Sequence, residues 1–282
     1  MILCAVDESE AADAVLDTAR WLAEGLHAPL RVIHVGAPSR PAEQLVERAR
    51  ERLGDERADV RVVSGSPAEA IRETADGEDA ELLVVGSRGH GGLRSAVLGS
   101  VSRELATRAR RPVVVVPPGE IAAADDGNAD SDGASVVCGV DGSDQALAGA
   151  AFAGRLAQRL GYRLVVVHAR QNVRAALSYP GARSATPPVT GQTDSVDRAA
   201  AQVVQRAVDA ADVSATGVTE PGPPAEILES VAQREDGRLL VITARGLGGV
   251  RASILGSVAA ELAAAATRPV VVLSEAVAAA AR

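Results

Sequence analysis

Glycine and serine residues with an unusual spacing follow an apolar run in the first half of the chain. Gly86, Gly89, Gly99 and Ser100 form the pattern G-x2-G-x9-G-S, and the preceding run 82–85 is typical of a buried strand. Glycines allow positive φ and a close approach of ligand to backbone. A helix that begins at the last two residues of the pattern offers free N–H groups to an anion. The spacing therefore predicts a cradle for a nucleotide phosphate chain, and it matches neither the dinucleotide fingerprint nor the lysine-containing P-loop.

Composition argues against several classes of function. The 282 residues carry a net charge of −8, no lysine, and only one Trp, one Phe and two Tyr. A nucleic-acid partner is not expected, because such surfaces need positive charge and aromatic stacking platforms. No apolar run approaches the roughly 18 residues of a membrane span, and the N-terminus carries no signal-like segment, so we expect no membrane association and a cytoplasmic location. The two cysteines lie in apolar runs, which predicts buried free thiols.

The chain is an internal repeat. Residues 2–9 match residues 136–143 at an offset of 134, and residues 65–69 match residues 222–226 at an offset of 157. The difference, 157 − 134 = 23 residues, indicates an insertion in the second half, which we place within residues 171–193. Its Pro, Gly, Ser and Thr content predicts a loop.

Two domains follow from this repeat. We expect a first domain over 1–118 and a second over 134–275, separated by an acidic linker over 119–133 and followed by a tail over 276–282 that is either a short helix or frayed. In the first half the expected strands are 2–6, 30–35, 60–63, 81–85 and 112–116, and the expected helices are 9–27, 41–53, 67–76 and 97–109.

This alternation of short apolar strands with helices predicts two doubly wound α/β domains with parallel sheets. Ser9 is the expected N-cap of the first helix. Ligands of such sheets bind beyond the carboxyl ends of the strands, at the switch point of the strand order. Asp7 ends the first expected strand and Gly86 follows the fourth, so both are expected at that edge.

The V-D-x-S after the first strand, the G-x-P-x-E before the third helix and the glycine pattern, in this order and repeated, resemble the universal stress protein family, and its tandem members in particular. The resemblance covers the chain apart from linker, insertion and tail. It implies a five-stranded sheet ordered 3-2-1-4-5 in each half. Many members of the family bind ATP, and others have lost the glycine pattern and bind none.

The resemblance also implies roles for single residues. Asp7 would contact the ribose and adenine side of ATP, and the main chain of Val35 would meet the adenine edge. A Mg²⁺ ion bound through the phosphates is implied as well, with no metal-ligating residue of the protein. The remaining implied cofactor-binding residues, along the ribose and phosphates, are Gly86, Arg88, Gly89, Gly99, Ser100, Val101 and Ser102.

The second half departs from this pattern. Thr243 replaces Gly86 and Ala259 replaces Ser102. Because a β-branched threonine disfavours positive φ and crowds the ribose position, we predict weaker or absent ATP binding there. The corresponding residues that the second half keeps are Asp141, Gly246, Gly256 and Ser257.

Other interpretations of these residues stay open. The glycine pattern can be a turn that binds nothing, Asp7 can begin a turn, and Arg88 can be solvated rather than reach a phosphate. His34 and its repeat His168 lack neighbouring ligands and indicate a polar rim rather than a metal site. Glu69, early in a helix, favours interaction with the helix dipole over catalysis.

We therefore expect an ATP-binding stress-response regulatory protein with little or slow hydrolysis and no catalytic residue, since no poised base or arginine finger is evident. The alternatives are a nucleotide-free interaction scaffold and a genuine ATPase that uses the same loop. The last strands, 112–116 and 269–273, are apolar edges, which are association hazards. The resemblance implies that they pair with each other, and a homodimer remains an option.

Overall fold

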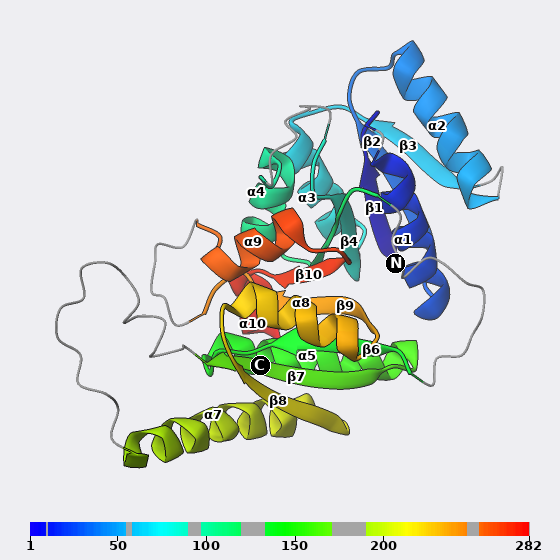
Figure 1. Cartoon of the computed structure of the whole chain (residues 1–282). Coiled ribbons are helices and arrows are strands. Elements are labelled where there is room, and N and C mark those ends of the chain that lie inside the picture. Colours follow the sequence, from blue (N-terminus) through cyan, green and yellow to red (C-terminus); the bar gives the residue numbers. More distant parts are fainter. Residues whose placement is uncertain are drawn as a thin grey trace.

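The structure is a computed structural model that describes residues 1–9, 11–54, 58–89, 97–119, 133–170, 190–246 and 254–281; of 190–195 it describes only the helical backbone. The two halves of the chain lie end to end, with β-sheet running through both and helices packed against it (Figure 1).

The strands are β1 (Ile2–Val6), β2 (Leu30–Val35), β3 (Asp59–Val63), β4 (Leu82–Gly86), β5 (Val113–Val116), β6 (Ser135–Gly139), β7 (Arg163–Arg170), β8 (Ala215–Pro221), β9 (Gly237–Thr243) and β10 (Val270–Leu273). The helices are α1 (Ala12–Gly25), α2 (Arg40–Leu53), α3 (Pro67–Gly77), α4 (Ser100–Arg108), α5 (Asp144–Leu160), α7 (Thr190–Ala211), α8 (Pro224–Arg234), α9 (Ser257–Ala265) and α10 (Glu275–Ala280).

Ten strands form one sheet in the order β3-β2-β1-β4-β5-β10-β9-β6-β7-β8. Within each half all neighbours are parallel and the order is 3-2-1-4-5, so the predicted doubly wound fold is confirmed. The halves meet where β5 and β10 pair antiparallel, with Val114 opposite Val271.

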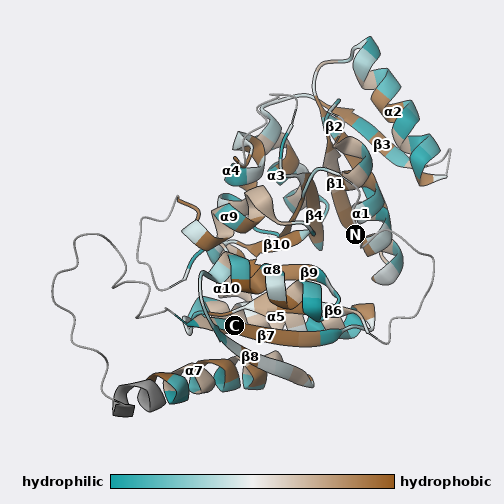
Figure 2. Cartoon of the chain, viewed as in Figure 1, coloured by the Kyte–Doolittle hydropathy of each residue, from teal (hydrophilic) through white to brown (hydrophobic). Residues whose placement is uncertain are grey.

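The central strands β1, β4, β5 and β10 are apolar and almost entirely buried, because helices cover both faces of the sheet (Figure 2). In β1, Ile2 and Cys4 face a core that includes residues of α1, α5 and α7, whereas Leu3 and Ala5 face a second core with residues of α3, α4, α8 and α9. Alternation along the strand thus supplies two hydrophobic layers from one run of five apolar residues.

Helix starts differ from the sequence prediction. The expectation that Ser9 caps the first helix is wrong: α1 begins at Ala12 after Ala11, and no side chain caps it. The hydroxyl of Ser9 instead donates to Asp7 Oδ1 at 2.5 Å. In the second half, Ser143 does cap α5 and accepts from the backbone N–H of Ala146 at 3.1 Å.

Two further boundaries were misplaced. The fourth helix, expected from Val97, begins at Ser100. The expected loop over 171–193 ends earlier than predicted, because α7 begins at Thr190; residues 171–189 and linker residues 120–132 lie outside the described residues. In the tail, Glu275–Ala280 is helical and the Ser274 hydroxyl accepts from Val277 N–H.

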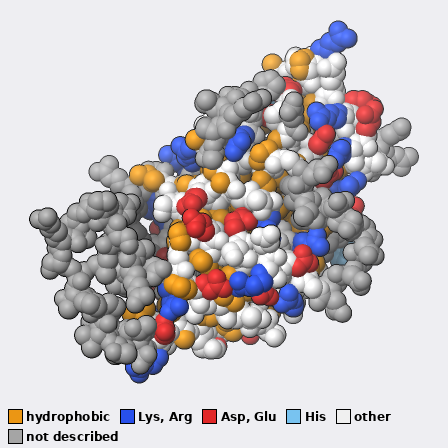
Figure 3. All heavy atoms as spheres, in the orientation of Figure 1, with side chains coloured by type: hydrophobic (Ala, Val, Ile, Leu, Met, Phe, Trp, Pro, Cys, Tyr) orange, Lys and Arg blue, Asp and Glu red, His pale blue; other side chains and the backbone are white. Residues whose placement is uncertain are grey.

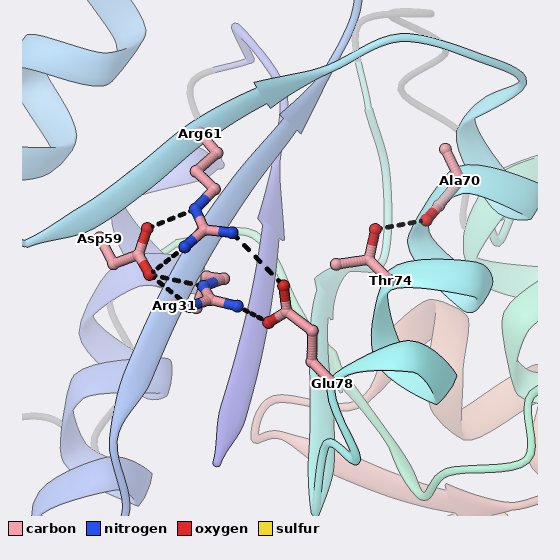
Figure 4. A network of polar contacts seen from close by, with 6 residues as sticks. All are labelled: Arg31, Asp59, Arg61, Ala70, Thr74 and Glu78. Carbon is pink, nitrogen blue, oxygen red and sulfur yellow. Dashed lines mark hydrogen bonds and ion pairs between the residues drawn. The ribbon is translucent and has the colours of Figure 1, made fainter.

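The outer strand of the first half carries a charge network (Figure 4). Arg31 on β2 and Arg61 on β3 both bind the Asp59 carboxylate, at 2.6 and 2.7 Å, and both reach Glu78 just beyond α3. Burial alone would raise the pKa of Asp59, but hydrogen bonds from the two arginines outweigh it and hold that pKa below its ordinary value. Charged side chains on an edge strand oppose pairing with other chains.

Acidic and basic side chains are interspersed on the face of the molecule shown in Figure 3. Within the described ranges, no helix combines the length and the apolar character that a membrane crossing requires.

The thiols of Cys4 and Cys138 are fully buried and unpaired. Burial raises the pKa of both, that of Cys138 to about 12 from an ordinary 9.0. The folded state therefore retains a proton that the unfolded chain releases. The contribution of Cys138 to stability is complete below pH 9.0 and is lost as pH rises toward about 12.

We predict that neither thiol reacts with an aromatic disulfide reagent at about pH 8 until the protein unfolds. Burial keeps the reagent away from the sulfur and disfavours the reactive thiolate form. Labelling rates measured across a urea series should follow the unfolded fraction. Rapid labelling of the native protein would contradict the prediction, and Cys138→Ala assigns the signal to one thiol.

Candidate functional site

A cavity of about 530 Å³ lies at the carboxyl ends of β1, β2 and β4, beside the first turn of α4. We call it the β1/β4 cavity. It lies at the switch point, because β1 is paired with β2 on one side and with β4 on the other. All nine first-half residues singled out from the sequence line it: Asp7, Val35, Gly86, Arg88, Gly89, Gly99, Ser100, Val101 and Ser102.

The rest of the lining is largely apolar, with three polar exceptions that sequence reasoning did not place in a ligand site. Val15 and Val85 contribute to the walls, and the exceptions are Glu8, Ser9 and His34. His34 was expected only as a rim residue. One sequence feature could have placed Glu8 in the site: it directly follows Asp7, which is repeated as Asp141.

Asp7 is held in a fixed orientation between two segments. Its Oδ1 accepts from the backbone N–H and the hydroxyl of Ser9, at 3.1 and 2.5 Å. Its Oδ2 lies so close to Gly89 that a Cβ at that glycine would overlap the oxygen. Asp7 therefore begins a turn, as one interpretation of the sequence held, and also lines the cavity.

The expectation that the loop glycines adopt positive φ is wrong. The described glycines with positive φ are Gly54, Gly65, Gly119, Gly142, Gly161 and Gly222. Both glycines are closely packed instead, Gly89 against the Asp7 carboxylate and Gly86 less tightly. A Cβ at Gly86 would lie 3.1 Å from the Arg88 carbonyl oxygen and 3.3 Å from Val15 Cγ2. The absent side chains let the loop pack down against β1 and α1.

Two hydrogen bonds to the carbonyl groups of Gly86 and Ser87, just after β4, position the N-terminus of α4. Gly99 is its N-cap and donates to the Ser87 carbonyl at 2.9 Å. The buried hydroxyl of Ser102 donates to the Gly86 carbonyl at 2.5 Å, so it braces the loop rather than pointing at solvent. The anion-binding capacity of this helix end therefore rests on the backbone N–H groups of its first turn and the exposed hydroxyl of Ser100.

Arg88 contacts the other half of the chain. Its Nη2 donates to the carbonyl oxygen of Ala264 in the last turn of α9, at 3.3 Å. That turn has no basic residue of its own, and a cation there interacts favourably with the helix dipole. The sequence suggested a phosphate contact or a solvated side chain, and the structure adds this third partner.

The second half builds the same arrangement with different chemistry. Asp141 Oδ1 accepts from the Ser143 N–H and hydroxyl at 3.0 and 2.6 Å, and its Oδ2 lies against Gly246. Gly256 caps α9, and Ser257 is its first residue.

Thr243 ends β9 and does not have positive φ, so the φ argument against it is wrong. Its hydroxyl donates to the Arg245 carbonyl at 2.5 Å.

Across the described residues, no group of three or more His, Cys, Asp or Glu side chains is arranged to hold a metal ion. His34 Nδ1 lies 3.0 Å from the Val6 carbonyl oxygen, and His168 Nδ1 lies 2.8 Å from that of Val140. Glu69 lies in the first turn of α3, where its charge favours the helix dipole.

The model of the universal stress protein family matches residues 1–117 and 134–274. The chain belongs to the universal stress protein family. A universal stress protein of Mycolicibacterium smegmatis is 30% identical over 299 residues, covering 96% of both chains. Another, from Mycobacterium tuberculosis, is 28% identical over 300 residues, covering 97% of this chain and 96% of its own.

Solved structures share the fold over nearly the whole chain. A protein described as functionally unknown from Pseudomonas aeruginosa has a TM-score of 0.65 at 16% identity, covering 99% of this chain and 94% of its own. A universal stress protein from Archaeoglobus fulgidus has a TM-score of 0.62 at 18% identity, covering 97% of both. The tandem two-domain layout of this universal stress protein is therefore shared with full-length relatives.

We predict that Gly89→Ala lowers the free energy of unfolding by about 1–3 kcal/mol, because the new Cβ overlaps the Asp7 carboxylate. Gly77→Ala is the matched control: it lies at the end of α3 with no atom within 4 Å of its Cβ position. Urea unfolding of both variants measures the difference. Equal stability of the two would show that the loop does not pack on Asp7.

Proposed function

We propose that the first half binds ATP in the β1/β4 cavity and that the protein is a nucleotide-responsive regulatory module of the stress response with little or slow hydrolysis. One observation carries the proposal: residues from four separate segments, chosen from sequence alone, line a single cavity at the switch point. Its volume of about 530 Å³ suits a nucleotide-sized ligand.

The phosphates are proposed to lie at the N-terminus of α4. Backbone N–H groups of Ser100, Val101 and Ser102 have no intrahelical partner there, and the positive end of the helix dipole favours an anion. Charge-assisted hydrogen bonds contribute roughly 1.5–3 kcal/mol each, so three or four support micromolar affinity after ordering costs. Mg²⁺ is proposed to enter with the phosphates and to be held by them.

The ribose and base are proposed to lie over the ends of β1 and β2, near Asp7 and the main chain of Val35. Aliphatic residues such as Val15 and Ile71 form the walls there. Because the described lining residues include no Phe, Tyr or Trp, base binding is proposed to depend on aliphatic contact and on hydrogen bonds to the edge of the base. The second half, with Thr243 and Ala259, is proposed to bind more weakly or not at all.

Slow hydrolysis follows from how the charged residues of the cavity are used. The Asp7 carboxylate is occupied by Ser9 and lies against Gly89, and the Arg88 guanidinium is directed to Ala264. Efficient phosphoryl transfer needs a water-orienting group and a cation on the transferred phosphate. Because Asp7 and Arg88 already have these partners, we propose that neither acts on the transferred phosphate.

Gly99→Val combined with Ser100→Ala is predicted to weaken ATP–Mg binding at least tenfold, because the valine branches cover the helix N-terminus and the hydroxyl is lost. Isothermal titration calorimetry measures this change. The control is Gly256→Val combined with Ser257→Ala at the equivalent positions of the second half, which is expected to leave the affinity of the first-half site unaltered.

Several results would replace this proposal. Equal binding in wild type and the first-half variant would overturn the site. Absence of bound nucleotide together with an unshifted melting temperature in ATP would favour the scaffold. Phosphate release well above background that Asp7→Asn abolishes, with the fold intact, would favour an ATPase.

We further propose that the two halves remain paired in solution through β5 and β10. The antiparallel ladder and the fully buried valines on both strands support this. Hydrogen exchange tests this proposal. The amides of 113–116 and 270–273 are expected to be among the slowest to exchange, and fast exchange there would show that the halves do not stay paired in solution. Sedimentation equilibrium then decides whether two chains associate further.

A further inference from the structure

The ten-stranded sheet ends in two outer strands of different character, β3 in the first half and β8 in the second (Figure 1). Asp59 and Arg61, which form an ion pair with each other, both lie on β3. At the repeat offset of 157, Thr216 on β8 takes the place of Asp59, and Val218 takes the place of Arg61. The described residues place no strand beyond β8. One end of the sheet is therefore charged at two positions that are uncharged at the other end.

The pairing of β8 with β7 shows which backbone groups of β8 face outward. Gly222, just after the strand, donates its N–H to the Arg170 carbonyl at the end of β7, at 3.0 Å. Because backbone groups alternate in direction along an extended strand, those of Ala215, Gly217 and Thr219 point away from β7. A row of N–H and C=O groups on an outer strand is a template for pairing with another strand.

Small side chains leave room beside this row. Gly217 lies at its centre, and a Cβ at that position would overlap Val204 of α7. A hollow of about 330 Å³ lies between α7 and β8, and Val208 and Thr219 contribute to its walls. On the opposite face of the strand, Thr216 is exposed. The outer margin of β8 is therefore open to a second strand on both faces.

A second copy of the chain fits this edge about a two-fold axis through Gly217. In an antiparallel pairing about that axis, Gly217 faces its own copy. Ala215 faces Thr219 of the second copy, and each facing pair exchanges two N–H···O bonds. Pro221 has no N–H, so the ladder ends before it. The edge is thus complementary to itself, which a two-fold contact requires.

The charges of β8 are compatible with the same register. Thr216 lies opposite Val218 of the second copy, and Glu220 lies opposite Ser214, just before the strand. No like charges therefore stand directly opposite each other, an arrangement that would destabilise the pair.

We propose that two copies of this chain form a homodimer through their β8 edges, by antiparallel pairing centred on Gly217. The joined sheet ends in a β3 strand on each side. Because charged side chains on an outer strand oppose further pairing, the assembly stops at two chains. This contact goes beyond the proposed nucleotide site and does not depend on it.

Sedimentation equilibrium of the full chain over a concentration series tests the proposal. The wild type is expected to pass from monomer to dimer without larger species. Thr216→Glu is expected to weaken the dimer at least about tenfold, because the new carboxylate lies diagonally across from its own copy and from Glu220 of the second chain. Val62→Glu is the matched control: Val62 is exposed on β3, and the variant is expected to associate as the wild type does.

A mixture of variants makes the test specific to this edge. Thr216→Glu mixed in equal amounts with Thr216→Lys is expected to regain the wild-type affinity to within about threefold, because opposite charges then meet across the axis. Such recovery also shows that Thr216→Glu folds.

Hydrogen exchange resolved by residue gives a second measurement on the wild type itself. The amides of Gly217 and Thr219 are expected to exchange more slowly as the protein concentration rises, because they bond to the second chain. The amides of Thr216 and Val218, which are directed to β7, are expected to exchange at the same rate throughout the series.

The outcomes decide the proposal in either direction. A chain that stays monomeric at every concentration overturns it. So does a dimer that Thr216→Glu weakens no more than Val62→Glu does, since another surface then makes the contact. Assemblies larger than two chains contradict the closed pairing, and protection of Thr216 in place of Gly217 contradicts the register. Loss of the dimer in Thr216→Glu alone, with recovery in the mixture, supports the proposal.

Discussion

The position of β1 between β2 and β4 is the constraint on which the candidate site depends. After β1 the chain turns to α1, which packs in one core, whereas after β4 it turns to α4, which packs in the other. The two segments must separate at the ends of these adjacent strands, and the separation leaves a crevice. Asp7 and the glycine loop meet across it only because Gly89 has no side chain.

Much of this architecture could be predicted from the sequence, because short apolar runs and turn residues repeat in register through both halves. The expected strands 2–6 and 30–35 are those of the structure, and the residues chosen for the cavity line it. The error about the loop glycines has a physical origin. A glycine in a sequence does not reveal whether it is needed for positive φ or for proximity, and at Gly86 and Gly89 proximity is the reason.

Interactions between distant residues were beyond sequence reasoning for a different reason. Arg88 and Ala264 are separated by 176 positions, and nothing local to either indicates that a side chain of one half reaches the last turn of a helix in the other. Likewise, the pairing of Glu8 with His34 requires that the ends of two strands be adjacent and that a carbonyl fix the ring. Local sequence patterns predict the helices and strands, whereas these contacts depend on how the helices and strands are placed against one another.

The two halves share a backbone design but have diverged in the groups that line it. Both place an aspartate against a glycine and cap the following helix with a second glycine. Only the first half has Gly86 at the end of its fourth strand and Glu8 beside its histidine; the second has Thr243 and Gly142 there. The shared scaffold therefore carries different side chains at these two positions of the lining.

The antiparallel join between β5 and β10 has a consequence for communication along the molecule. Since each half is parallel within itself, the strands of one half run opposite to those of the other, and their carboxyl ends open at opposite margins of the sheet. Side chains bridge the halves outside the strand pairing as well: Arg88 reaches the Ala264 carbonyl, Arg159 the Leu26 carbonyl and Ser274 the Ala109 carbonyl.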